Sequence, residues 1–201
     1  MRTRRLSIAA AAASIAILTR CSPLAGQWVV TAHVGADRFW GGPRETTDQR
    51  RSFRPYRPTT FAIGLERRGG SLGVGLCLGY SSAGLALEGG DAVAAVDGVF
   101  GVYSAAPELF YRISALGANE LMVHGGPLFE VWKIIDEESK TRVGGQAGVS
   151  LRVPLGGRFA GSLMAGAALI PSPLSSDLLT PGVENRALWR RRVAGGLEYR
   201  L

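Results

Sequence analysis

The sequence predicts an all-β fold: a transmembrane antiparallel up-and-down β-barrel of about eight strands, after an N-terminal signal peptide. Three observations carry this prediction. Apolar residues recur at every second position over eight segments, which is the period of a strand and not of a helix. The connections between these segments alternate between short and long, as in membrane barrels. The chain also begins with an export signal.

Residues 1–25 have the layout of a secretory signal peptide. Four arginines and no acid lie in this segment, and the cationic start is followed by an apolar stretch of about thirteen residues, which is too short to span a bilayer as a mature helix. We expect cleavage after Ala25 or Gly26, which leaves residues 26–201 as one barrel domain. A lipid anchor on Cys21 is the weaker alternative, because Thr19 and Arg20 precede it where small residues are usual.

Removal of the signal peptide changes what charge and cysteine content imply. The formal net charge falls from +7 to +3, so the excess of basic residues is only weak evidence about partners. We expect no nucleic-acid binding. Cys77 becomes the only cysteine, so no internal disulfide can form. After the signal no apolar run approaches eighteen residues, and a membrane role would require strands.

The predicted strands share a length that suits a tilted membrane strand of about 9 to 11 residues. They cover 27–37, 59–67, 72–86, 101–113, 120–133, 142–155, 159–172 and 188–201. The connections 68–71, 114–119 and 156–158 are short and contain Gly or Ser, whereas 38–58, 87–100 and 173–187 are long, with a shorter acidic loop at 136–140. This alternation places the short turns and both chain ends in the periplasm.

The parity of these strands separates most of the charge from the apolar residues. The apolar parity holds residues such as Leu72, Leu76, Val149 and Leu197, with Arg191 near the start of the last strand as an exception, whereas the opposite parity holds His33, Asp37, Glu66, Glu108, Arg112, His124, Glu130, Arg142, Arg152, Glu198 and Arg200. Because a charge at the bilayer midplane costs about 2–4 kcal/mol, we expect the apolar face to meet lipid. Glycines on the polar parity are expected to leave room for Glu and Arg pairs in the lumen.

The aromatic residues predict two belts at the membrane interfaces. One level holds Trp28, Tyr111, Phe159 and Tyr199, and the other holds Phe61, Tyr80, Tyr103, Phe129 and Trp189. The alternative is that these rings plug the two ends of a soluble barrel.

At this point the chain resembles the small outer-membrane barrels of the OmpA transmembrane-domain and OmpX type. Members of this family end with a strand that carries a glycine and then alternating hydrophobic residues, which the barrel-insertion machinery reads. Gly196, Leu197, Tyr199 and Leu201 fit that pattern. The departures are Leu where Phe is commonest at the terminus and Ala194 where a polar residue is expected.

The candidate chemistry is sparse, and we expect no cofactor, no metal and no catalytic site. His33 and His124 are the only histidines, both have inward parity, and neither shows the His-x-Ser spacing of the lipid A deacylases. The favoured interpretation is an interior histidine that bonds a carboxylate such as Glu130 or Asp37. Two histidines and one cysteine on separate strands give no ligand spacing for a metal.

Two groups of arginines are expected at the outer rim. We expect lipopolysaccharide phosphates to contact Arg50, Arg51, Arg54, Arg57, Arg190 and Arg191, because arginine binds phosphate through two parallel hydrogen bonds. For Arg191 the alternative is that it snorkels from a lipid-facing position.

The sequence therefore favours an integral, non-enzymatic protein of the bacterial outer membrane with a structural, adhesive or envelope-maintaining role. Its expected partners are membrane lipid, lipopolysaccharide and the barrel-insertion machinery. Three alternatives stay open: a narrow porin-like pore or carrier for a small lipophilic ligand, a lipid A-modifying enzyme, and a soluble periplasmic calycin-like binding barrel.

Overall fold

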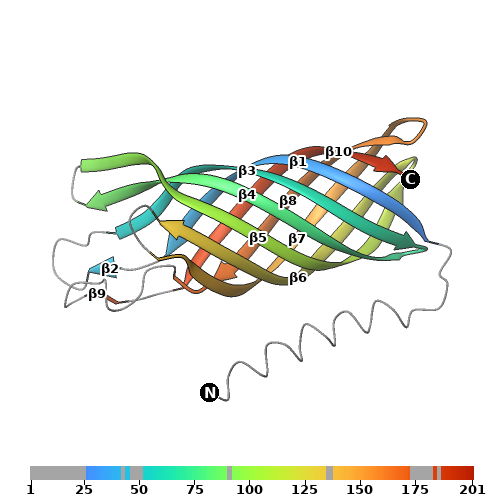
Figure 1. The fold of residues 1–201 in the computed structure, drawn as a ribbon. Helices are drawn as coiled ribbons and strands as arrows, with labels where there is room; N and C mark the ends of the chain where they lie inside the picture. The colour runs from blue at the N-terminus through green and yellow to red at the C-terminus, as the bar shows by residue number, and fades with distance from the viewer. Residues whose placement is uncertain are drawn as a thin grey trace, which may run out of the picture.

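The computed structural model describes residues 26–41, 44–45, 52–89, 92–134, 138–172, 183–184 and 187–201. Eight long strands form the wall of a barrel (Figure 1): β1 Gln27–Gly41, β3 Ser52–Gly69, β4 Leu72–Gly89, β5 Ala92–Leu116, β6 Asn119–Ile134, β7 Lys140–Gly156, β8 Phe159–Ile170 and β10 Leu188–Arg200. The short strands β2 Arg44–Glu45 and β9 Val183–Glu184 lie at one end. Among the described residues, no helix is long and apolar enough to cross a bilayer.

The sheet closes because β1 pairs antiparallel with both β3 and β10. A path that steps from strand to strand through directly paired residues starts at Trp28, passes Arg67 on β3 and Arg191 on β10, and returns to β1 at Arg38. The ends of this path, residues 28 and 38, are ten residues apart on the same strand. A stagger of this size requires strands that tilt strongly against the barrel axis, as in known membrane barrels.

Three two-residue turns join the long strands at the end where the barrel's own termini meet. Gly70, Gly117 and Gly157 occupy these turns with φ of 60°, 67° and 56°, a region that only glycine enters without strain. At the same end the Leu201 amide donates to the Trp28 carbonyl over 3.0 Å. The predicted short turns are therefore confirmed, on the same side as both ends of the barrel.

At the opposite end the strands are longer than the sequence predicted. The expected loop 87–100 is wrong, because β4 continues to Gly89 and β5 begins at Ala92, with Gly89 paired to Ala92. The expected loop 38–58 is also shorter, since β1 reaches Gly41 and β3 begins at Ser52. Pro58 has no backbone N–H to donate, and the ladder accommodates it through a register shift between Tyr56 and Thr59.

The apolar parity faces outward in the described part of the long strands. Leu76, Val149 and Leu197 are 45%, 45% and 56% exposed, whereas Glu130 and Glu198 on the opposite parity are buried in the lumen. A soluble binding barrel would show the reverse distribution, with its apolar side chains inside. The predicted transmembrane β-barrel is therefore confirmed as the fold class.

The ladder between β5 and β6 is interrupted at one level. Pairing stops after Ala105 and Phe129 and resumes at Leu109 and Gly125, and Pro107 and Pro127 lie between these points. Proline has no backbone N–H, so neither residue can donate to the opposite strand. Each proline still pairs with its other neighbouring strand, which keeps the wall continuous.

Glycines inside the lumen make room for the polar side chains, which allows a direct test. A Cβ at Gly148 would lie 2.6 Å from His124 Nε2 and 2.7 Å from the Ala165 carbonyl oxygen, whereas a Cβ at Gly145 on the same strand meets nothing within 4 Å. We expect Gly148→Ala to lower the free energy of unfolding by about 1–3 kcal/mol, as overpacking does. Urea unfolding in detergent micelles, followed by tryptophan fluorescence, measures this change.

The matched control is Gly145→Ala, which we expect to change the stability by less than about 0.5 kcal/mol. Equal midpoints for the two variants would contradict the assignment of Gly148 to the crowded lumen.

Candidate functional site

The lumen near the termini is filled by a chain of ion pairs. Arg68 donates from Nε to Glu66 Oε2 over 2.7 Å and from Nη1 to Glu198 Oε2 over 2.9 Å. Arg152 continues the chain, with its Nε 3.0 Å from the same Glu198 oxygen and its Nη1 2.9 Å from Glu120 Oε2. These side chains come from β3, β6, β7 and β10, so the pairs cross the lumen and tie distant strands together.

The middle of the lumen is organised around Glu108. Its Oε1 lies 3.0 Å from His124 Nδ1 and accepts a hydrogen bond from Gln146 Nε2 over 2.7 Å. The His124 ring stacks on Phe110 with centroids 5.7 Å apart. The sequence predicted that an interior histidine bonds a carboxylate, and His124 does so. The carboxylate is that of Glu108, however, and not that of Glu130 or Asp37.

Two further ion pairs fill the lumen towards the loop end. Arg192 donates to both carboxylate oxygens of Asp37, over 2.8 and 3.0 Å. Arg190 donates to Glu130 Oε1 over 2.5 Å, and the Trp132 indole N–H donates to the other oxygen of Glu130 over 2.9 Å. Both carboxylates are thus fully engaged by neighbouring donors, as a buried charge requires.

Above these pairs an aromatic cluster occupies the cross-section of the barrel. Phe39 and Phe100 meet Trp132 edge to face, with centroids 6.0 and 5.9 Å from its ring. Trp132 has 0% exposure, and Leu188 and Val102 complete the cluster. At this level the described side chains form a packed hydrophobic core inside the barrel.

The structure brings a histidine and a serine together that the sequence did not connect. His33 Nε2 lies 2.9 Å from Ser162 Oγ, although the residues are 129 positions apart. Both side chains are buried, and His33 Nδ1 has no hydrogen-bond partner among the described residues. A catalytic triad needs a carboxylate that orients this second nitrogen, and no described carboxylate bonds it.

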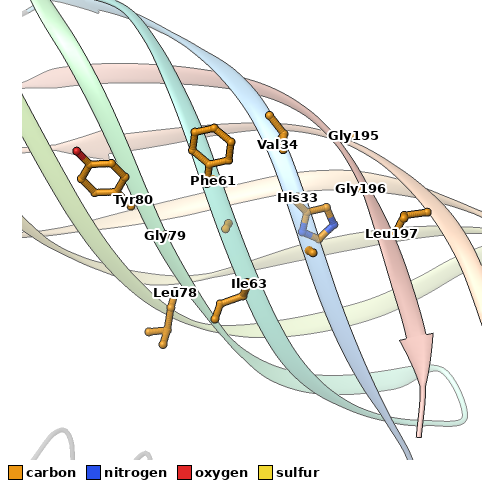
Figure 2. Close-up of a pocket in the computed structure, with 12 residues that line it drawn as sticks. His33, Val34, Phe61, Ile63, Leu78, Gly79, Tyr80, Gly195, Gly196 and Leu197 are labelled. Carbon is orange, nitrogen blue, oxygen red and sulfur yellow. The ribbon is translucent and has the colours of Figure 1, made fainter. Parts of the chain in front are cut away.

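A shallow groove of about 640 Å³ lies on the outside of β1, β3, β4 and β10 (Figure 2). Its walls are the outward side chains Val34, Phe61 and Tyr80 on one side and Ile63, Leu78 and Leu197 on the other. Gly195 and Ala32 keep the floor low between them. The lining of this groove is mainly apolar and suits an acyl chain, with the Tyr80 hydroxyl as its outward polar group.

Solved structures with the same architecture include three bacterial proteins. The outer membrane protein OprG from Pseudomonas aeruginosa is 12% identical, with a TM-score of 0.55 over 88% of this chain and 96% of that one. This chain has the fold of a small outer-membrane β-barrel. Neisserial surface protein A is 11% identical, with a TM-score of 0.51 over 86% and 96% of the two chains.

The third is a major outer membrane protein from Thermus thermophilus, 14% identical with a TM-score of 0.50 over 87% of this chain and 99% of that one. No protein-family model and no curated protein matches the sequence. At these identities the likeness shows the fold, and the role of this outer-membrane barrel rests on its own side chains.

The aromatic residues predicted to form two belts all belong to the outward parity. Tyr80 and Tyr103 lie side by side with ring centroids 5.1 Å apart, and Phe159 and Tyr199 do so at 5.0 Å. On β5, Tyr103 and Tyr111 belong to different belts and are separated by eight residues, or about 20 Å along the axis of a tilted barrel. This distance is close to the lipid-facing height of about 25 Å that membrane barrels show.

The prediction that arginines at the outer rim contact lipopolysaccharide needs one correction, at Arg190. Arg190 is 2% exposed and faces the lumen, where it binds Glu130, so it cannot reach a lipid headgroup. Arg191 is exposed, with its guanidinium carbon 4.2 Å from the centre of the Trp40 ring. Arg50 and Arg51 lie outside the described residues. Arg54 and Arg57 belong to β3, but their side chains also fall outside what the structure describes.

The structure gives a physical reason for the glycine of the terminal strand, whose role as an insertion signal stays a prediction. A Cβ on Gly196 would lie 2.3 Å from both His33 Cδ2 and the Ala32 carbonyl oxygen. Leu197 and Leu201 are exposed, at 56% and 60%. Within the described part of the chain, no three His, Cys, Asp or Glu side chains group into a metal site.

The buried pair of Arg190 and Glu130 should be the most costly one to break. We expect Arg190→Met to lower the free energy of unfolding by about 3–5 kcal/mol, because Glu130 is then buried without its counter-ion. The double variant Arg190→Met with Glu130→Gln should regain part of that loss. Urea titration of the folded protein in micelles measures all three.

Arg191→Met, one position along the strand, is the control, and we expect a change below about 0.5 kcal/mol. A loss at Arg191 as large as that at Arg190 would show that the two side chains do not face opposite sides of the wall.

Proposed function

We propose that this chain is an integral protein of the bacterial outer membrane with a non-enzymatic structural, adhesive or envelope-maintaining role. One observation carries the proposal: a continuous apolar outer face surrounds a lumen that is filled by paired charges and packed rings. A wall of this kind suits a bilayer, and a filled interior leaves the ends and the outer surface as the places where partners can bind.

The lumen argues against the pore and carrier alternatives. The cavity around Glu108 and His124 has a volume of only about 40 Å³, which holds one or two water molecules and no lipophilic ligand. Above it, Phe39, Phe100 and Trp132 fill the cross-section. A conducting barrel would need these side chains to move.

The enzyme alternative receives little support from the described side chains. His33 and Ser162 touch, but both face the lumen and no carboxylate orients the ring. A lipid substrate would reach the outer face, where the groove beside His33 is lined by apolar side chains. For partners, we propose membrane lipid and, through the terminal strand, the barrel-insertion machinery.

Four tryptophans allow a test of the membrane assignment, since they lie on both sides of the wall. Trp28 and Trp189 are each 44% exposed on the outer face, whereas Trp132 is enclosed. In proteoliposomes, variants that keep a single tryptophan should show strong quenching by acyl-brominated phosphatidylcholine at Trp28 or Trp189. The same lipid should leave the fluorescence of Trp132 nearly unchanged, because the wall separates it from the acyl chains.

Heat-modifiable gel migration confirms in parallel that each variant is folded. Failure of the folded protein to enter vesicles, or quenching of Trp132 as strong as that of Trp189, would rule out the membrane barrel and favour a soluble one.

The filled lumen leads to a second prediction about conductance. The wild-type protein in a planar bilayer should stay at the baseline current. Phe39→Ala combined with Trp132→Ala removes two rings of the aromatic cluster, and we expect small discrete current steps from this variant. The control is Trp189→Ala, which removes a ring from the outer face and should leave the current at baseline. Stable wild-type steps equal to those of the double variant would instead support the pore.

A further inference from the structure

Two arginines and two tryptophans form a patch on the outer face of β1 and β10, which we call the Arg/Trp patch. It consists of Arg38 and Trp40 on β1 and of Trp189 and Arg191 on β10. Arg38 pairs directly with Arg191, and Trp40 pairs directly with Trp189. The residues between them along each strand, Phe39 on β1 and Arg190 on β10, are buried in the lumen, so the four members of the patch share the outer side of the wall.

The two guanidinium groups have like charge and lie on directly opposed residues, an arrangement that destabilises a sheet unless something neutralises it. No described carboxylate contacts Arg38 or Arg191. The nearby acids Asp37 and Glu130 face the lumen and already bind Arg192 and Arg190. The outer pair therefore carries two positive charges that the described side chains leave unbalanced.

Arg191 is also held in place. Its guanidinium carbon lies 4.2 Å from the centre of the Trp40 ring, a cation–π contact that uses the face of the group and not the hydrogen-bonding capacity of its N–H donors. Trp189 lies next to Trp40 across the strand pair and is exposed, so an apolar surface adjoins the two charges. A ligand for this patch needs an anionic oxygen group joined to an apolar or sugar body.

The height of the patch on the barrel indicates where that ligand lies. Arg38 is ten residues beyond Trp28 on β1, which corresponds to about 25 Å along the axis of a tilted barrel. Trp28 belongs to the belt at the turn end, so the patch lies at the other membrane interface, on the side away from the termini. In the proposed topology this interface is the outer leaflet.

We propose that Arg38 and Arg191 together bind a phosphate of lipid A in the outer leaflet, while Trp40 and Trp189 pack against its sugar and the start of its acyl chains. The inference rests on the proposed membrane location and goes beyond it by naming the ligand and the residues. Two forked guanidinium groups match the oxygens of one phosphate, and the phosphate balances their charge. In this site Arg38 accompanies Arg191 as a phosphate-binding residue, a role that the sequence analysis expected for Arg190.

The test uses full-length mature protein, folded in detergent micelles, and native mass spectrometry of the bound lipid. The probes are bisphosphorylated lipid A, the same lipid after removal of its phosphates, and phosphatidylglycerol. We expect the wild type to retain bisphosphorylated lipid A and to bind the dephosphorylated form at least about tenfold more weakly. Arg38→Gln combined with Arg191→Gln should lose at least about tenfold in lipid A binding.

The matched control removes two positive charges at the turn end, with Arg67→Gln and Arg158→Gln, and should bind lipid A as the wild type does. Arg38→Lys combined with Arg191→Lys should keep only part of the wild-type affinity, since an ammonium group cannot form the forked contact.

Unchanged binding by the double Gln variant, or an equal loss in the control, would overturn the site. Equal binding of phosphatidylglycerol and lipid A by the wild type would overturn the choice of ligand. Because vesicle insertion is measured separately, a protein that inserts but does not bind lipid A contradicts this inference and leaves the membrane role standing.

Discussion

Closure of the strand ladder in an apolar solvent is the constraint on which the rest of the molecule depends. Lipid offers no hydrogen-bond partner to a free backbone N–H or carbonyl, so a spanning sheet must pair its first strand with its last. Here β1 meets β10, and the ten-residue stagger between Trp28 and Arg38 sets the tilt of every strand. Eight tilted strands enclose a space that their own side chains can fill.

The narrow lumen then determines which side chains can lie inside. Buried carboxylates such as Glu130 and Glu198 need counter-ions from other strands, and the arginines that supply them fill the remaining space. Each histidine packs in the lumen against a glycine whose missing side chain leaves room for the ring: His124 lies against Gly148 and His33 against Gly196. In a lumen packed in this manner the charged side chains already bind one another. This is the physical reason to look for function on the outside of the wall.

Parity made most of this fold predictable from the sequence. A period of two divides each strand into an apolar face and a face with most of the charge, and that division correctly placed Leu76 outside and Glu198 inside. What the period cannot supply is the partner of each charge. His33 meets Ser162 across 129 residues, and Glu108 meets Gln146 across 38, because the register of closure decides these contacts. Strand ends were the second gap, for a related reason: residues 92–96 form an apolar run without alternation, and only pairing to β4 selects a strand over a loop there.

The run Arg190, Arg191 and Arg192 shows how one rule assigns different roles to identical residues. The period of the last strand sends Arg190 and Arg192 into the lumen, where Glu130 and Asp37 neutralise them. The same period turns Arg191 to the outside, beside Arg38 and over Trp40. The acids of this region are engaged by the inner two, so the outer guanidinium is left to a partner that the membrane must supply. Basic composition alone could not have made this distinction, because it depends on which side of a thin wall each charge stands.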